Sequence, residues 1–296
     1  MLPAGLDVVD ARSADAYVAG HVPGSASLPW KGDDGLRDRL FQLPPPGDQA
    51  RLGLVVDAAD RDAVLEFLLS KRYTVPPEHV LVPDGAEPAI RALLSETGER
   101  PHARLWRPVP FVAETIDEIE QHLAGEHGPA AHSGPWTALD VGCGAGRNAV
   151  FMAMRGSWHI DCIDNYPSML DNTRRLGEAH RVADALTIEN VDVRKPEPLT
   201  GRQYDMVLVG SFLLRGLFPL LADLVRPGGV IVYVHFLQGA QFVGKCTPKK
   251  DSSLLNEGEL ATVFGPEAGF LVMRDERTEA TDGRPVAQFL AAKKRS

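Results

Sequence analysis

The chain has 296 residues, of which 44% are hydrophobic and 24% are charged, and its formal net charge is −9. This composition is typical of a globular protein with a substantial core, and the length favours two domains over one. The acidic balance argues against a nucleic-acid partner, because proteins that bind nucleic acid usually present a basic face.

The N-terminal third alternates short apolar segments with helical periodicity. We expect strands at residues 7–10, 52–57 and 79–82, and helices at residues 60–72 and 86–96. Strands that alternate with helices in this way predict a small parallel sheet.

A glycine- and proline-rich turn follows the first strand. Asp10 and Arg12 precede the run Gly20-His21-Val22-Pro23-Gly24. This pattern resembles the rhodanese family, and the resemblance covers about residues 4–97. It implies that residues 1–99 form a rhodanese-like domain, which is a candidate site for binding a protein partner.

The chemistry of that family requires a cysteine nucleophile at the end of the strand that here finishes with Val55-Val56. This chain has Asp57 at that place and no cysteine before Cys143. A carboxylate cannot carry a persulfide sulfur, so we expect the domain to be inactive in sulfur transfer, with His21 as a structural turn residue.

Residues 100–112 contain three prolines and read as a linker and lead-in segment. Trp106 and Phe111 flank these prolines. Two interpretations remain open: the two aromatic residues pack the linker onto the second domain, or they close over a cofactor pocket there.

The second predicted domain, residues 113–296, begins with a helix and then a strand that brings Asp140 into a glycine turn of Gly142, Gly144 and Gly146. Glycines allow a ligand to approach bare backbone, and the following helix start offers free N–H groups. A dinucleotide site would show G-x-G-x-x-G instead of this G-x-G-x-G spacing. An acidic residue before the turn suits a ligand that carries an ammonium group.

The run Leu139 to Gly146 resembles the first motif of the class I S-adenosylmethionine (SAM) methyltransferases. The resemblance implies SAM as the cofactor, with Asp140 near the methionine amino group and the glycine backbone beside the methionine portion.

Further acidic residues follow the next two predicted strands. Asp164 and Asn165 come about twenty positions after the glycine turn, where a carboxylate can accept hydrogen bonds from both ribose hydroxyls. NAD enzymes use the same arrangement, so Asp164 does not choose between cofactors. The resemblance implies that Asp192 and Val193, after the third strand at 186–190, meet the adenine.

The fourth strand, 203–209, leads into Gly210 and Ser211, which face the cofactor and substrate in similar enzymes. Arg226-Pro227-Gly228-Gly229 then ends a helix at 217–225 and starts a fifth strand at 230–234, as in class I methyltransferases. Segments 270–277 and 286–292 predict a closing hairpin. We therefore expect an α/β chain: a small rhodanese-like parallel-sheet domain, then a Rossmann-like methyltransferase domain with an antiparallel last strand.

The C-terminal part, from His235 through Leu254-Leu255-Asn256-Glu257-Gly258-Glu259-Leu260, resembles the subgroup of tellurite-resistance methyltransferases. That implies a small-molecule methyl acceptor, such as a thiol or a chalcogen oxyanion. His235 is the candidate general base, with a structural histidine as the alternative. Arg215 is a second catalytic candidate; Arg215 and Lys245 would hold an anionic substrate or pair with surface acids.

Two other functions remain open: a non-catalytic SAM-binding or regulatory protein, and an NAD-dependent oxidoreductase. The three cysteines (Cys143, Cys162 and Cys246) lack metal-ligand or C-x-x-C spacing, so we expect no metal and a reducing compartment. We find neither a signal peptide nor an apolar run of membrane-spanning length, which predicts a cytoplasmic protein with no membrane partner.

Overall fold

The computed structural model describes residues 2, 5–44, 51–83, 92–98, 104–127, 134–195, 197–243, 250–280 and 282–295. The chain divides into two compact units, residues 1–107 and 108–296. The division falls inside the segment 100–112 that the prolines mark in the sequence. Most of the predicted helix 86–96, together with Lys245 and Cys246, lies outside the described residues. Within the described ranges, no helix is both long and apolar enough to cross a bilayer.

The first unit contains a four-stranded sheet in the order β2-β1-β3-β4, and every neighbouring pair is parallel. This is the arrangement that its alternating strands and helices predict. Its elements are β1 (Asp7–Asp10), α1 (Ala14–Ala19), β2 (Ala26–Ser27), β3 (Leu52–Val55), α2 (Arg61–Ser70) and β4 (Val80–Leu81), with single 3-10 turns at Leu40–Gln42 and Pro77–His79.

The turn residues of this unit form one buried network. Arg12 donates to both carboxylate oxygens of Asp10 at 2.9 and 2.6 Å and to the Gly20 carbonyl at 2.7 Å. The His21 ring stacks on Tyr17 with 3.9 Å between ring centroids, and its Nδ1 lies 2.9 Å from the Tyr17 carbonyl. These contacts use the polar groups to hold the α1–β2 turn together.

The second unit is built on a seven-stranded sheet in the order β10-β11-β9-β8-β5-β6-β7. Its strands are β5 (Trp136–Val141), β6 (Trp158–Asp164), β7 (Leu186–Asn190), β8 (Tyr204–Gly210), β9 (Val225–Phe236), β10 (Phe270–Glu279) and β11 (Pro285–Lys293). Its helices are α4 (Pro110–His127), α5 (Arg147–Ala153), α6 (Pro167–Ala179), α7 (Phe218–Leu224) and α8 (Glu259–Val263), with short 3-10 turns in the connections.

Strands β5 to β9 are parallel, and β11 runs antiparallel to both β9 and β10. The predicted closing hairpin is therefore confirmed. The strand order reverses at β5, because β6 and β7 follow on one side and β8 and β9 on the other. In an open α/β sheet this reversal leaves a crevice at the carboxyl ends of the strands, where ligands bind.

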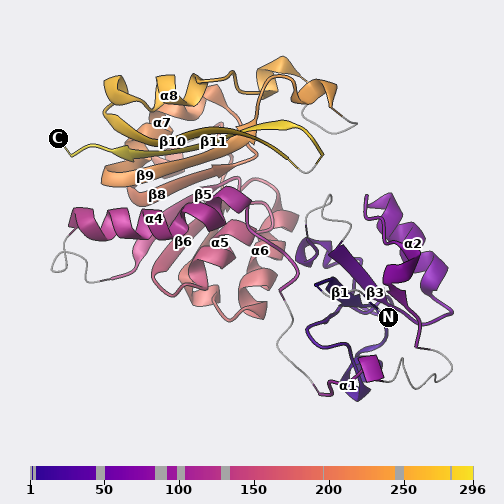
Figure 1. The fold of residues 1–296 in the computed structure, drawn as a ribbon. Helices are drawn as coiled ribbons and strands as arrows, with labels where there is room; N and C mark the ends of the chain where they lie inside the picture. Colours follow the sequence, from indigo (N-terminus) through magenta and orange to yellow (C-terminus); the bar gives the residue numbers. More distant parts are fainter. Residues whose placement is uncertain are drawn as a thin grey trace. The chain divides into compact units, whose positions relative to one another are not determined.

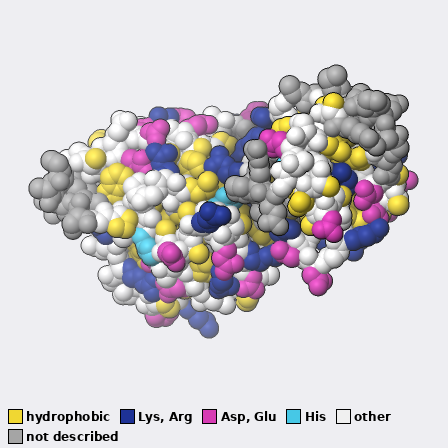
Figure 2. Space-filling view, turned by 90° about the horizontal axis from the view of Figure 1, so that it is seen from below, with side chains coloured by type: hydrophobic (Ala, Val, Ile, Leu, Met, Phe, Trp, Pro, Cys, Tyr) yellow, Lys and Arg dark blue, Asp and Glu magenta, His cyan; other side chains and the backbone are white. Residues whose placement is uncertain are grey.

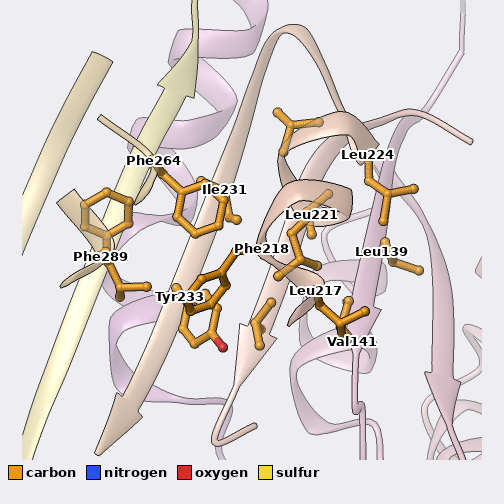
Figure 3. Close-up of a cluster of buried hydrophobic side chains, with 14 of the residues drawn as sticks. Leu139, Val141, Leu217, Phe218, Leu221, Leu224, Ile231, Tyr233, Phe264 and Phe289 are labelled. Atoms are coloured by element: carbon orange, nitrogen blue, oxygen red, sulfur yellow. The ribbon is translucent and has the colours of Figure 1, made fainter. Parts of the chain in front are cut away.

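Helices cover both faces of this sheet: α4, α5 and α6 lie on one face and α7 and α8 on the other (Figure 1). On the second face, Phe218, Leu221 and Leu224 of α7 lie among strand side chains (Figure 3). Those strand residues include Leu139, Val141, Ile231, Tyr233 and Phe289, and Phe264 joins them after α8. Full burial of a side chain of this kind contributes about 1.5–3 kcal/mol, so the cluster holds the strand ends in fixed positions.

The fifth strand of this sheet starts earlier than the sequence predicts. β9 begins at Val225, so Arg226 to Gly229 lie inside the strand. Its pairing with β8 shifts from Tyr204↔Val225 to Met206↔Val230, which leaves these four residues as a bulge. Arg226 forms an ion pair with the buried Asp205 at 2.9 Å, and a Cβ on Gly229 would lie 2.8 Å from the Asp205 carbonyl. The bulge thus packs against Asp205 at the start of β9, at the opposite end of the strand from the candidate site.

Charged side chains of both signs are mixed on the face drawn in Figure 2. The net charge of −9 is therefore not gathered into one acidic surface on that face.

Candidate active site

The glycine turn follows β5 directly and is shaped by three positive φ angles: 68° at Gly142, 56° at Gly144 and 74° at Gly146. Other residues rarely adopt such angles. A Cβ on Gly146 would lie 2.5 Å from the Thr173 side chain, so this glycine is needed for the approach of α6. A Cβ on Gly144 would meet nothing within 4 Å. Gly144 therefore faces the open side of the turn, where a ligand can reach its backbone.

The side chain of Thr173 supports the glycine turn, a role that no pattern in the sequence predicts. Its hydroxyl lies 2.9 Å from the Gly144 carbonyl, and the residue is fully buried. The backbone N–H groups of Gly142 and Cys143 both donate to the Ile163 carbonyl, at 2.9 and 3.0 Å. The turn is thus attached to both α6 and β6.

Asp140 is buried beside this turn, with 1% of its surface exposed. Burial, with a smaller contribution from the negative charge of Asp164, raises the pKa of Asp140 to about 7, and a hydrogen bond from the backbone of Ala149 opposes the rise. Its Oδ2 has no hydrogen-bond partner among the described residues. A buried carboxylate oxygen in this position is an acceptor that a cationic donor would satisfy.

Asp164 ends β6 at the same edge of the sheet. Its Oδ2 accepts the Gly144 N–H at 3.0 Å, and its Oδ1 accepts the Tyr166 N–H at 2.9 Å. A carboxylate has about four acceptor positions, so each oxygen keeps one for a ligand. The neighbouring Asn165 is exposed in the turn before α6.

Asp192 lies two residues beyond β7 and is partly exposed. Arg194 donates to both of its carboxylate oxygens at 2.8 and 2.9 Å, and this contact lowers the pKa of Asp192. Asp192 therefore stays ionised as a hydrogen-bond acceptor, although Arg194 occupies part of its capacity. Val193 is half-buried and packs against the core on the α7 face.

Gly210 and Ser211 are at the carboxyl end of β8, next to the reversal point of the sheet. Ser211 is exposed and has a φ of 56°, a left-handed conformation that is uncommon for a residue with a side chain. Its backbone N–H donates to the Val234 carbonyl at 2.8 Å, which holds this conformation in place. Strained residues of this kind cluster at functional sites.

Asn148 is a site residue that the sequence reasoning missed. Its Oδ1 accepts the Val109 N–H at 2.9 Å, and its Nδ2 lies 3.5 Å from the position of a Cβ on Gly210. Asn148 thus joins the segment before α4, the start of α5 and the end of β8. Its place two residues after Gly146 was the signal available in the sequence.

The two lead-in aromatics separate at the division between the units. Phe111 is fully buried in the core of the second unit with Val112 and Ile116. Trp106 belongs to the first unit and has 1% of its surface exposed. For Phe111, this placement agrees with the packing interpretation.

His235 lies near the carboxyl end of β9, and Arg215 begins the 3-10 turn Arg215–Leu217 that follows β8. His235 is buried, its Nε2 is 2.9 Å from the Ser253 carbonyl, and its Nδ1 has no partner among the described residues. Burial lowers the pKa of His235, so the ring is neutral at pH 7. Arg215 forms a forked ion pair with Glu259 at 2.5 and 2.8 Å. This is the pairing with an acid that the sequence left as an alternative to substrate binding.

The two described cysteines, Cys143 and Cys162, are buried free thiols. Across the described ranges there is no cluster of three or more His, Cys, Asp or Glu residues able to hold a metal ion.

Comparison with known proteins finds similarities that include the central part of this unit. Residues 138–229 match the family model described as a methyltransferase domain. A ribosomal protein L11 methyltransferase from Alkalilimnicola ehrlichii is 29% identical over 68% of this chain and 76% of its own length. An uncharacterized protein of Schizosaccharomyces pombe, UNK4.09, is 21% identical over 96% of this chain and 93% of its own length. Among solved structures, TehB from Haemophilus influenzae aligns with a TM-score of 0.44 and 18% identity, over 60% of this chain and 67% of that one.

Proposed function

We propose that this chain, whose residues 138–229 match a methyltransferase domain, uses SAM to methylate a small-molecule acceptor at the carboxyl ends of β5, β6, β8 and β9. The observation that carries the proposal is the convergence of Asp140 and Asp164 on one glycine turn at the reversal point of the sheet.

The groups around this turn fit SAM. The unpartnered Oδ2 of Asp140 suits the ammonium group of the methionine portion. The open side of Gly144 leaves room against the backbone. The two remaining acceptor positions of Asp164 match the two ribose hydroxyls. Asn165, Asp192 and Val193 are assigned to the nucleoside end, and Gly210 and Ser211 to the side facing the acceptor.

When bound, SAM supplies a methyl group on a sulfonium, a leaving group that needs no further activation. The tasks left to the protein are alignment and the exclusion of water. Asp140 and Asp164 would hold the cofactor by its charged and hydroxyl groups, and Ser211, with its left-handed backbone, would face the acceptor.

The first unit is proposed as a rhodanese-like module without sulfur-transfer activity. The Asp10–Arg12–Gly20 network supports the resemblance, because the residues of the family signature hold one turn. Asp57, two residues after the end of β3, supports the loss of activity. A role in binding a protein partner remains part of this proposal.

Calorimetric titration with SAM, S-adenosylhomocysteine and NAD tests the cofactor assignment. Submicromolar to micromolar binding of the first two without NAD binding is expected. Tight NAD binding would instead favour an oxidoreductase. Transfer of a labelled methyl group then separates acceptor classes, with thiols, phenols, amines and selenite as small molecules and ribosomal proteins as a second panel. SAM binding without any turnover on either panel would favour a regulatory protein.

A further inference from the structure

The segment Asp251–Leu255, here called the strap, lies along the carboxyl end of β9. It forms an isolated parallel bridge between Leu255 and Leu237, and the Leu255 N–H donates to the Phe236 carbonyl at 3.0 Å. All five of its backbone carbonyls accept hydrogen bonds from three residues at the ends of β8 and β9, namely Arg215, His235 and Gln238. The strap is therefore fixed to this end of the sheet along its whole length.

Arg215 supplies the strongest part of this attachment. Its guanidinium donates to Ser252 and Leu254 at 2.8 and 2.7 Å and to both oxygens of Glu259. Four of its five N–H groups are thus used. Glu259 also accepts the Asn256 N–H at 2.9 Å. Arg215 is consequently committed to the strap and leaves little capacity to bind an anionic substrate.

The Ser253 carbonyl decides the tautomer of His235. A carbonyl oxygen only accepts, so the Nε2 of His235, 2.9 Å away, must be the protonated nitrogen. Nδ1 then carries the lone pair, and it is buried with no partner among the described residues. A buried acceptor left in this state is costly unless a donor arrives. A group that satisfies Nδ1 must therefore bring an O–H, N–H or S–H bond.

We propose that Arg215 and Glu259 are positioning residues that hold the strap so that His235 presents an unprotonated Nδ1 to a protic methyl acceptor. This inference rests on the proposed function and narrows it to acceptors of the hydroxyl, thiol or amine class, as against chalcogen oxyanions. A lone pair at Nδ1 attracts an acceptor that carries a proton and repels an oxyanion.

The proton balance follows from this tautomer. A bond forms between the acceptor atom and the methyl carbon, the carbon–sulfur bond breaks with its electron pair remaining on sulfur, and the proton of the acceptor passes to Nδ1. Burial and the charge of Arg215, which is itself paired with Glu259, both lower the pKa of His235, while the Ser253 contact opposes them. The neutral ring is thus ready to take a proton at pH 7.

Nitrogen NMR of histidine-labelled protein tests the tautomer directly, with His235 assigned from the spectrum of His235→Gln. A neutral ring protonated at Nε2 is expected. Arg215→Lys and Glu259→Gln should each release the strap and produce a mixture of tautomers. Glu257→Gln is the matched control, because Glu257 is exposed and forms its ion pair with Arg277, away from the strap. An Nδ1-protonated ring, or a tautomer unchanged in both strap variants, would overturn the proposal.

Methyl transfer to catechol, 2-mercaptoethanol, benzylamine and sodium selenite tests the acceptor class. His235→Gln keeps an N–H donor for the Ser253 carbonyl but removes the base, so kcat on the protic acceptors should fall about 100-fold or more. SAM affinity should stay within about twofold, because the change lies outside the cofactor groups. Turnover of selenite alone would refute the acceptor class. Loss of SAM binding by the unchanged protein would refute the proposed function instead, and the NMR result stands on its own if none of the four probes turns over.

Discussion

Replacing Asp140 with Asn should stabilise the protein and weaken its cofactor binding at the same time. The folded protein raises the pKa of Asp140 from 3.8 to about 7, mainly through burial. The folded state therefore binds more protons than the unfolded state between these values, and stability is lost as the pH rises from about 4 to about 7. The cost at pH 8 is about 4 kcal/mol, since each pKa unit corresponds to about 1.4 kcal/mol.

Asn keeps the shape of Asp140 and removes this cost. At pH 5 only about 1.6 kcal/mol of it has developed, so the stabilisation by Asp140→Asn should grow by about 2.5 kcal/mol between pH 5 and pH 8. For a unit of this size that corresponds to about 5–10 °C in Tm. Without the carboxylate, the ammonium group of SAM loses its charged partner, which should weaken binding about tenfold or more.

Differential scanning calorimetry of the cofactor-free protein measures the change in stability. The unfolding transition whose Tm rises when SAM is added is assigned to the second unit. Asp171→Asn is the control, because Asp171 is exposed and paired with Arg174, and it should change neither quantity. An Asp140→Asn protein that is no more stable at pH 8 than the parent, or whose gain does not change with pH, would refute the assignment of a buried, unsatisfied carboxylate.

Other outcomes follow from the same site. Asp164→Ala should weaken SAM binding by about 1.5–3 kcal/mol in calorimetric titration, since charged hydrogen bonds are lost, and a change of less than twofold would remove Asp164 from the ribose site. Gly146→Ala should lower Tm by several degrees, because its Cβ would lie 2.5 Å from Thr173; an unchanged Tm would contradict this. The new Cβ of Gly144→Ala meets no atom within 4 Å, so this variant should lose only about 1 kcal/mol of stability, for its positive φ. For each degree of Tm lost, Gly144→Ala should weaken SAM binding more than Gly146→Ala does. SAM binding at pH 7 should release about half a proton, seen as a heat that depends on the buffer, and binding without proton release would argue against contact with Asp140.

The sequence could predict the second unit well because its strands end in recognisable chemistry. β7 and β8 start and end within one residue of their predicted limits, and the apolar runs of β6 and β8 stop at Asp164 and Gly210. The predicted start of β9 was wrong because proline and glycine, here Pro227, Gly228 and Gly229, usually separate helices and strands. Here they form a bulge whose shape depends on Asp205, in another strand.

The site was less predictable where a contact joins distant segments. Thr173 lies 29 residues from Gly144, and no local pattern links the two. Arg215 and Glu259 are separated by 44 residues, so the alternatives for Arg215 could be told apart only in three dimensions. The sequence could predict that Asp140 and Asp164 lie close together, because the last residues of parallel strands meet at one edge of the sheet.

The glycine turn also bears on how related chains should be interpreted once catalysis is lost. Packing against Thr173 constrains Gly146, so a related chain that has lost methyl transfer should still need this glycine for folding. No atom of the protein lies within 4 Å of a Cβ at Gly144, so the constraint on its side-chain space comes from a bound ligand. A relative with a side chain at the position of Gly144 and a glycine at that of Gly146 would have kept the fold and lost cofactor binding. The reverse pattern would indicate that α6 packs differently against the turn.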